Sequence, residues 1–304
     1  MSRKCYLTLV LLFLCLQGAL AQDSLLSVLK KEMPPEKERT IATFKSIKII
    51  NAQTNETTAK RTLDFRIAHR FGNFLSYDGN GTGGFHNFYG LDDPNFDIRI
   101  EFDYGISDRF MAGISRSKKD ENLEGHLKFR LIEQSTDDHI PLSLSIYTSS
   151  AYTPMLDPEG IFTTSDNRFS YATQAILARK FSPRFSLELI PSWVHRNLIT
   201  NPDDNNDIYS LGGGGRWKFT KSAAIIADYF YDFRTAAVSN LYYNPLGAGV
   251  EIETGGHVFS IMFSNAQYLI EQEFIPNTTD SWAKNGWKFC FNISRVFPFK
   301  KGNS

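Results

Sequence analysis

Three histidines stand in strings of residues that could carry chemistry. They are His69 in His-Arg-Phe-Gly, His195 in Val-His-Arg-Asn and His257 in Thr-Gly-Gly-His-Val-Phe. Imidazole is a common metal ligand and a common general base near neutral pH. Three such ligands form a zinc site only if all of them reach one ion at about 2 Å. The elements that carry the histidines therefore decide whether such a site can form.

A second set of chemically active residues is charged and recurs at every second position. These residues alternate with apolar ones, so they share one face of extended segments. One interpretation is a network of ion pairs that fills a narrow barrel, since enclosed polar groups need partners. The other is a water-filled pore that selects small charged solutes. The lumen-lining candidates are Arg66, Arg70, Arg99, Glu101, Asp103, Lys128, Arg130, Glu188, Arg216, Asp228 and Glu251.

The apolar positions between these charges predict strands. Phe96, Ile98 and Ile100 are one such series, and similar series recur from about residue 61 to the end of the chain. Most series reach the roughly 9 to 11 residues that a tilted strand needs to cross a bilayer, and about twelve can be counted. Aromatic residues make up 14% of the chain, which fits the aromatic girdles of a membrane barrel.

The connections favour a membrane barrel over a soluble sandwich. Short links such as Ser182-Pro183-Arg184 alternate with long links such as 72–95 and 269–285. Outer-membrane barrels pair short periplasmic turns with longer outer loops in this way. We therefore predict an all-β fold, a closed antiparallel up-and-down transmembrane β-barrel of about twelve strands, with a short N-terminal periplasmic or plug segment.

The chain divides into four predicted parts. Residues 1–21 combine early positive charge, a short apolar core and small residues at Ala19 and Ala21, which predicts an export signal peptide. Residues 22–60 are polar and mixed, and are predicted to be a periplasmic lead or a plug for the lumen. Residues 61–299 are the predicted outer-membrane barrel, and 300–304 a periplasmic tail. Inside the barrel, Gly212 to Gly215 are expected to permit curvature or the close approach of a plug.

The composition excludes several classes of protein. The 33 basic and 33 acidic residues balance, which argues against a nucleic-acid binder. After the signal no stretch approaches the roughly 20 apolar residues of a membrane helix, so insertion must be by strands. Removal of the signal leaves Cys290 as the one cysteine, so an internal disulfide cannot form.

The predicted topology separates the three histidines. His69 and His195 would end strands on opposite sides of the barrel, and His257 would begin a strand at the periplasmic rim. We therefore expect no metal site among them, no cofactor, and amphipathic roles near the membrane interface. An outer-membrane phospholipase would need His, Ser and Asn on the outer lipid-facing rim, and no His-x-Ser pair occurs on one lipid-facing strand. We expect that the protein is not an enzyme, with a hydrolase as the third alternative.

Several strings resemble a known family. They are Phe65 to Gly72, Tyr89 to Asp92, Asp103 to Arg109, Thr254 to Phe259 and Phe291 to Arg295. They are similar to the membrane bound beta barrel domain family of unknown function, and the likeness runs from about Thr43 to Phe297. The resemblance implies an outer-membrane barrel and supplies no activity or substrate. It also implies that His69, His195 and His257 belong to the family's recurring strings.

These inferences predict an exported protein in the outer membrane of a Gram-negative bacterium. Its role would be a narrow or gated channel for small charged solutes. The alternative is a non-conducting scaffold or binding barrel for a periplasmic partner. Its expected partners are outer-membrane lipid and, during biogenesis, the barrel-assembly machinery, since the strand that ends in Phe297-Pro298-Phe299 resembles that machinery's recognition signal.

Overall fold

The computed structural model describes residues 42–73, 96–199, 201–235 and 238–299, which form a closed barrel of twelve antiparallel strands. The strands are β1 (Thr62–Asn73), β2 (Asp97–Ser107), β3 (Phe110–Ser117), β4 (Leu123–Ile132), β5 (Ser143–Tyr152), β6 (Phe169–Ser182), β7 (Phe185–Arg196), β8 (Asp207–Lys218), β9 (Ala223–Phe233), β10 (Leu246–Thr254), β11 (His257–Ser264) and β12 (Lys288–Pro298). The helical pieces are η1 (Lys119–Glu121), η2 (Ser165–Arg168), α4 (Glu271–Asn277) and η3 (Trp282–Lys284).

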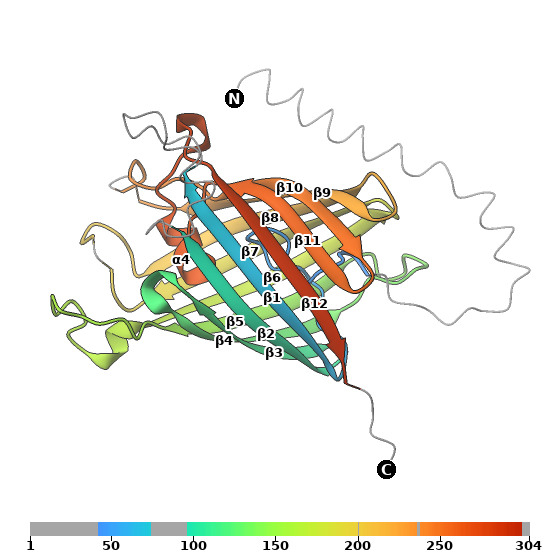
Figure 1. The fold of residues 1–304 in the computed structure, drawn as a ribbon, viewed down its shortest axis with the longest axis horizontal. Coiled ribbons are helices and arrows are strands. Elements are labelled where there is room, and N and C mark those ends of the chain that lie inside the picture. The colour runs from blue at the N-terminus through green and yellow to red at the C-terminus, as the bar shows by residue number, and fades with distance from the viewer. Residues whose placement is uncertain (1–41, 74–95, 200, 236–237, 300–304) are drawn as a thin grey trace, which may run out of the picture. The chain divides into compact units, whose positions relative to one another are not determined.

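Each strand pairs with its neighbours in the sequence, and β1 closes the barrel against β12 (Figure 1). Ile67 lies opposite Ile293 of β12 and opposite Ile100 of β2, so β1 is paired on both edges. Closure leaves no exposed strand edge, which is the condition for a sheet to span a bilayer. The predicted fold class is confirmed.

The connections at the two ends differ in length, largely as the sequence predicts. One end has tight turns such as the one between Ser107 and Phe110, and the other has long links such as the one between Ser264 and Lys288. The alternation has one exception, because the turn-end link 133–142 is longer than the opposite-end link 118–122. In Figure 1 the long connections lie on the left.

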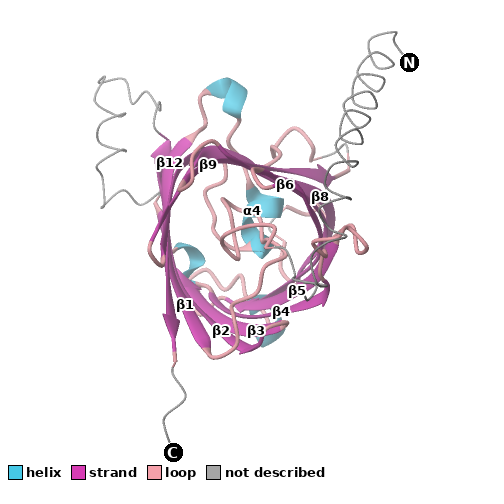
Figure 2. Cartoon of the chain, turned by 90° about the vertical axis from the view of Figure 1, so that its right-hand side faces the viewer, coloured by secondary structure: helices cyan, strands magenta, loops and turns pink. Residues whose placement is uncertain are grey.

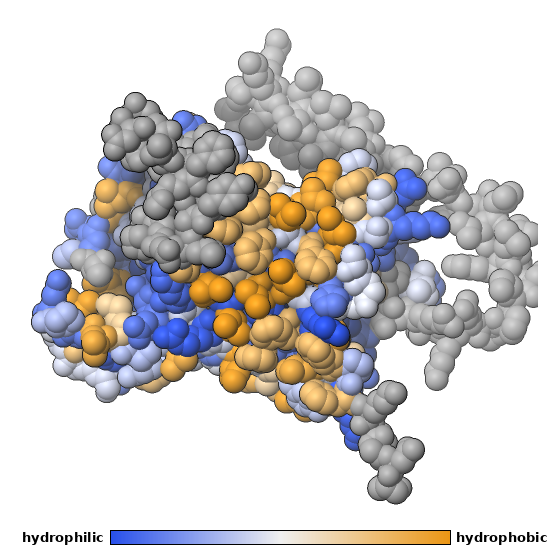
Figure 3. Space-filling model, in the orientation of Figure 1, coloured by the Kyte–Doolittle hydropathy of each residue, from blue (hydrophilic) through white to orange (hydrophobic). Residues whose placement is uncertain are grey.

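The outer surface of the barrel is apolar at its middle. Outward-facing side chains such as Ile114, Leu189 and Ile261 are half-exposed or more, whereas their neighbours along each strand point inward and are buried. Figure 3 shows apolar residues gathered over the middle of the visible wall, with more hydrophilic residues toward the ends. The alternation follows from strand geometry, since successive side chains point to opposite faces. No helix in the described ranges is long and apolar enough to cross a membrane.

Two segments of the protein itself fill the inside of the barrel. Residues 42–58 and residues 265–278 of the link between β11 and β12, which include α4, both lie within the ring of strands (Figure 2). We call them the N-terminal plug segment and the outer plug segment. The predicted signal peptide, residues 22–41, the string Tyr89 to Asp92 and the tail 300–304 lie outside the described residues.

Candidate functional site: a lumen closed by two segments

The N-terminal plug segment forms a short turn deep inside the barrel. Lys48 and Gln53 make an antiparallel bridge, and the backbone N–H of Ile49 donates to the carbonyl of Ala52 at 3.0 Å. Ile49, Ile50 and Ala52 are almost completely buried. Such a turn cannot rest in a lumen unless its backbone groups find partners there.

Asp228 of β9 binds the tip of this turn. Its carboxylate accepts the backbone N–H of Asn51 at 2.6 Å, the backbone N–H of Ala52 at 2.8 Å and the side-chain amide of Asn51 at 3.1 Å. From β1, Arg70 donates to the carbonyl of Ile50 at 3.0 Å. Asn292 donates to the carbonyl of Ile49 at 3.1 Å. The wall therefore binds mainly backbone groups of the plug, together with the side chain of Asn51.

Further cations on the inner wall, among them Lys128, Arg66 and Arg130, donate to the same segment. The Lys128 ammonium donates to the carbonyls of Ile47 at 2.9 Å, Thr54 at 3.1 Å and Glu56 at 3.3 Å, which uses all three of its N–H bonds. Arg66 donates to the Ser46 hydroxyl at 2.7 Å and to the Lys48 carbonyl at 3.3 Å. Nearer the end with the short turns, Arg130 pairs with Glu56 at 3.0 Å.

The outer plug segment meets the N-terminal one inside the barrel. Glu271, the first residue of α4, forms an ion pair with Lys48 at 3.0 Å and accepts a hydrogen bond from Gln53 at 3.0 Å. Tyr147 of β5 donates to the same carboxylate at 3.3 Å. The next residue, Gln272, donates to the Ser149 hydroxyl at 2.7 Å. The two segments are thus fastened to each other as well as to the wall.

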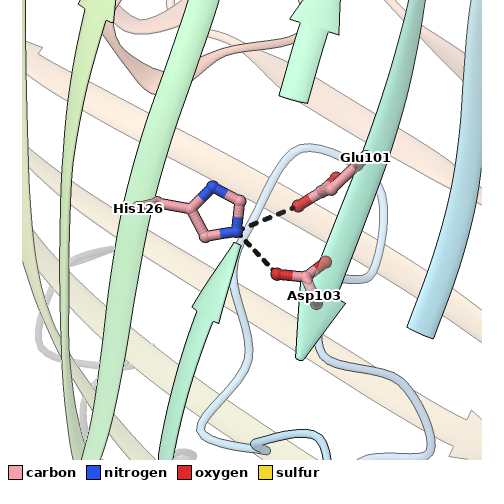
Figure 4. A group of neighbouring side chains, drawn as sticks. All are labelled: Glu101, Asp103 and His126. Carbon is pink, nitrogen blue, oxygen red and sulfur yellow. Dashed lines mark hydrogen bonds and ion pairs between the residues drawn. The ribbon is translucent and has the colours of Figure 1, made fainter. Parts of the chain in front are cut away.

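A group of charged side chains spans the neighbouring strands β2 to β4. Arg99 donates to Glu124 at 2.6 Å and lies 3.3 Å from Glu101. His126 Nε2 lies 2.6 Å from Asp103 Oδ1 and 3.7 Å from Glu101 Oε1, and Figure 4 shows both carboxylates turned toward this ring nitrogen. All five side chains are buried. The charges that alternate along the sequence therefore pair across strands.

Part of the inner wall on β7 and β9 is apolar, which the sequence analysis does not predict. Ile190, Ile226 and Phe230 point inward from β7 and β9 and pack with Phe274 and Ile275 of α4 in one core. Phe230 and Phe274 meet edge to face with centroids 5.2 Å apart. The prediction of a charged inner face throughout is therefore incomplete. These strands carry apolar residues on both faces, and only the lipid-facing series was assigned from the sequence.

The remaining lumen-lining candidates also point inward. Glu188 is buried beside Gly214, where a Cβ atom would lie 2.8 Å from the Ile49 side chain of the plug. The glycine thus allows the close approach of the plug. Arg216 donates to Glu251 at 2.7 Å and also contacts Glu253. Within the described residues, the contacts of Arg216 and Glu251 do not extend to His126 in the charged group on β2 to β4.

The three histidines of the recurring strings do not meet. His69 is covered on the outer face of β1 and stacks on Phe96 and Phe291, each with centroids 5.3 Å apart. His195 lies at the outer rim and contacts Asp207 at 2.9 Å. His257 begins β11, at the other end. Their separation agrees with the predicted topology.

The outer plug segment also forms the floor of a cavity of about 420 Å³ at the end with the long links. Glu273 and Asn277 of α4 line it and bond to each other at 2.6 Å, while Arg196 donates to Asn277 at 3.1 Å. Burial, reinforced by the nearby Asp120, raises the pKa of Glu273 to about 7. The helix α4 therefore faces the cavity through Glu273 and contacts the N-terminal plug segment through Glu271.

Comparisons with known proteins agree with this architecture. The profile of the family described as "Membrane bound beta barrel domain" matches residues 44–297. The chain belongs to this family. It is an outer-membrane β-barrel of the Gram-negative type. No curated protein matches its sequence.

Solved outer-membrane barrels are among the structures that this chain is similar to. The NanC porin is 9% identical with a TM-score of 0.45, and the match covers 79% of this chain and 100% of that one. An outer membrane channel from Pseudomonas putida is 11% identical with a TM-score of 0.45, covering 80% and 98%. A KdgM porin in complex with disordered oligogalacturonate is 8% identical with a TM-score of 0.44, covering 79% and 99%. At these identities the likeness concerns the fold alone.

Sequence reasoning missed the meeting of His126 with Glu101 and Asp103. Period-two alternation places all three on the inner face, and that signal was available. It does not give the register between strands, so it does not show which inner residues lie side by side.

Proposed function

We propose that the protein is a gated outer-membrane channel for small charged solutes, and that the conformation described above is its closed state. The observation that carries the proposal is the way the plug is held. Charged wall residues such as Lys128 and Asp228 bind backbone groups of residues 47–56 across the lumen. If the plug leaves, the same side chains line a charged path.

Contacts to a plug backbone suit a gate better than a permanent filling. Hydrogen bonds exchange with water at a small net cost, so water that enters the lumen can replace the plug as the partner of each charge. The cavity above α4 supplies a place where a solute from outside can reach the outer plug segment.

The test is conductance in planar lipid bilayers. The intact protein should remain mostly closed, whereas a variant that lacks residues 42–58 should show discrete openings. In that background Lys128→Ala should shift selectivity toward cations, because one positive charge leaves the wall. Lys221→Ala, in the turn after β8, is the matched control and should leave selectivity unchanged.

Each of these variants must first be shown to fold. The assay is the heat-dependent mobility shift that folded barrels show on gels. The full-length variant Asp228→Ala provides a milder opening of the gate and does not depend on the deletion. If both the folded deletion variant and Asp228→Ala stay non-conducting, the channel proposal fails, and a scaffold that binds a periplasmic partner becomes the better account.

A further inference from the structure

We propose that Glu101, Asp103 and His126 bind a divalent transition-metal ion inside the barrel, and that zinc is the ion that fits best. One ligand atom from each residue lies within 4.8 Å of the others. One imidazole nitrogen with two carboxylate oxygens is a ligand set that zinc accepts in tetrahedral sites with a further ligand. Figure 4 shows the three side chains converging from two strands.

A glycine on β3, the strand between β2 and β4, leaves room for Asp103 and His126 to meet. Asp103 of β2, Gly113 of β3 and His126 of β4 lie directly opposite one another in the register. A Cβ atom at Gly113 would lie 2.2 Å from His126 Nε2 and 2.5 Å from Asp103 Oδ1. Since any side chain at Gly113 would collide with both ligand atoms, the glycine allows residues two strands apart to meet.

Each carboxylate has one oxygen near His126 Nε2, Asp103 Oδ1 at 2.6 Å and Glu101 Oε1 at 3.7 Å, and a second oxygen that is short of partners. Asp103 Oδ2 and Glu101 Oε2 have no hydrogen-bond partner among the described residues, although Asp103 is 0% and Glu101 2% exposed. Buried carboxylate oxygens are normally hydrogen-bonded, so two such atoms in one group require an explanation. A cation that is coordinated by both oxygens of each carboxylate, or by rotated carboxylates, would use these oxygens and remove the cost of leaving them bare.

The surroundings resemble the outer shell of a metal site. Glu124 Oε2 lies 4.0 Å from Nδ1, the other nitrogen of the His126 ring. The two atoms are not hydrogen-bonded at this distance, so only the negative charge of Glu124 favours a proton on Nδ1, the tautomer that leaves the Nε2 lone pair for a metal. The nearby cation Arg99 also pairs with Glu124, so it keeps a partner if Glu101 turns toward the ion.

A proton is the competing occupant of this place. An imidazolium at His126 would pair with both carboxylates and need no metal. The two alternatives differ in composition, since zinc binding displaces the proton between His126 and Asp103. An ion would also join β2 to β4 across β3, which makes the folded barrel more resistant to heat when the metal is present.

The experiment uses the full mature chain, purified in detergent, stripped with a chelator and titrated with zinc sulfate. We expect one zinc per chain by elemental analysis and a higher unfolding temperature in its presence. Cobalt chloride serves as the spectroscopic probe and should give visible absorption bands of a nitrogen and oxygen site. His126→Gln should abolish the zinc uptake and the cobalt absorption bands. His195→Gln, at the outer rim, should leave both unchanged.

The proposal is overturned if the stripped wild-type protein takes up no zinc, or if His126→Gln binds as much as the wild type. If His126→Gln does not fold, X-ray absorption of the zinc-loaded wild type decides instead. A spectrum with one imidazole and otherwise oxygen ligands supports the site. A spectrum without imidazole, or with two or more, refutes it.

Discussion

Asp228 offers the sharpest test of how the plug is held. The change to alanine removes the acceptor of two buried backbone N–H groups, those of Asn51 and Ala52. Each buried donor left without an acceptor costs about 1–3 kcal/mol, so the closed state should lose roughly 2–6 kcal/mol relative to the open one. Since about 1.4 kcal/mol is a factor of ten, the open population should rise by a factor of roughly 30 to 10⁴.

Hydrogen exchange read by mass spectrometry measures this directly, because the amides that lose their acceptor are the reporters. Peptides that contain residues 49–52 should exchange faster in Asp228→Ala. The matched control is Asp232→Ala, on the same inner face of β9, since no hydrogen bond of Asp232 in the described ranges reaches the plug. The reasoning is refuted if residues 49–52 exchange in Asp228→Ala at the same rate as in the wild type. It is also refuted if the control Asp232→Ala accelerates their exchange equally.

Two further predictions concern the outer plug segment and the lipid face. The pKa of Glu273 is raised from its ordinary 4.5 to about 7, so its stabilising contribution is full below about 4.5 and is lost as the pH rises through about 7. Exchange protection of α4 should therefore fall between about pH 5 and about pH 8, after correction for intrinsic rates, and Glu273→Gln should remove this dependence. Leu189 is 49% exposed on the outer face of β7, and Leu189→Arg should cost about 2–4 kcal/mol in denaturant unfolding in lipid. Leu156→Arg, in a loop where the leucine is 88% exposed, should cost nothing measurable; equal losses would place the lipid band elsewhere.

Much of the architecture follows from the sequence. A strand that separates lipid from an enclosed interior must alternate apolar and polar residues, and this alternation identified the strands, their number and the outward face. Lys128 and Asp228 were assigned to the interior by phase alone, and both are buried there. The apolar inner residues of β6 to β9, such as Ile190 and Phe230, were not predicted. Where both faces of a strand carry apolar residues, the alternation does not distinguish the inner face from the outer one.

What the sequence by itself determined is the face on which each strand residue lies, because a strand's side chains alternate with a fixed period of two. What only the tertiary structure decided is which inner residues meet. That depends on register between strands and on the path of the plug, and neither leaves a periodic trace. Asp103, Gly113 and His126 come together only when β2, β3 and β4 pair in one particular register. Asn51 reaches Asp228 only because the barrel closes around residues that lie far away in the chain.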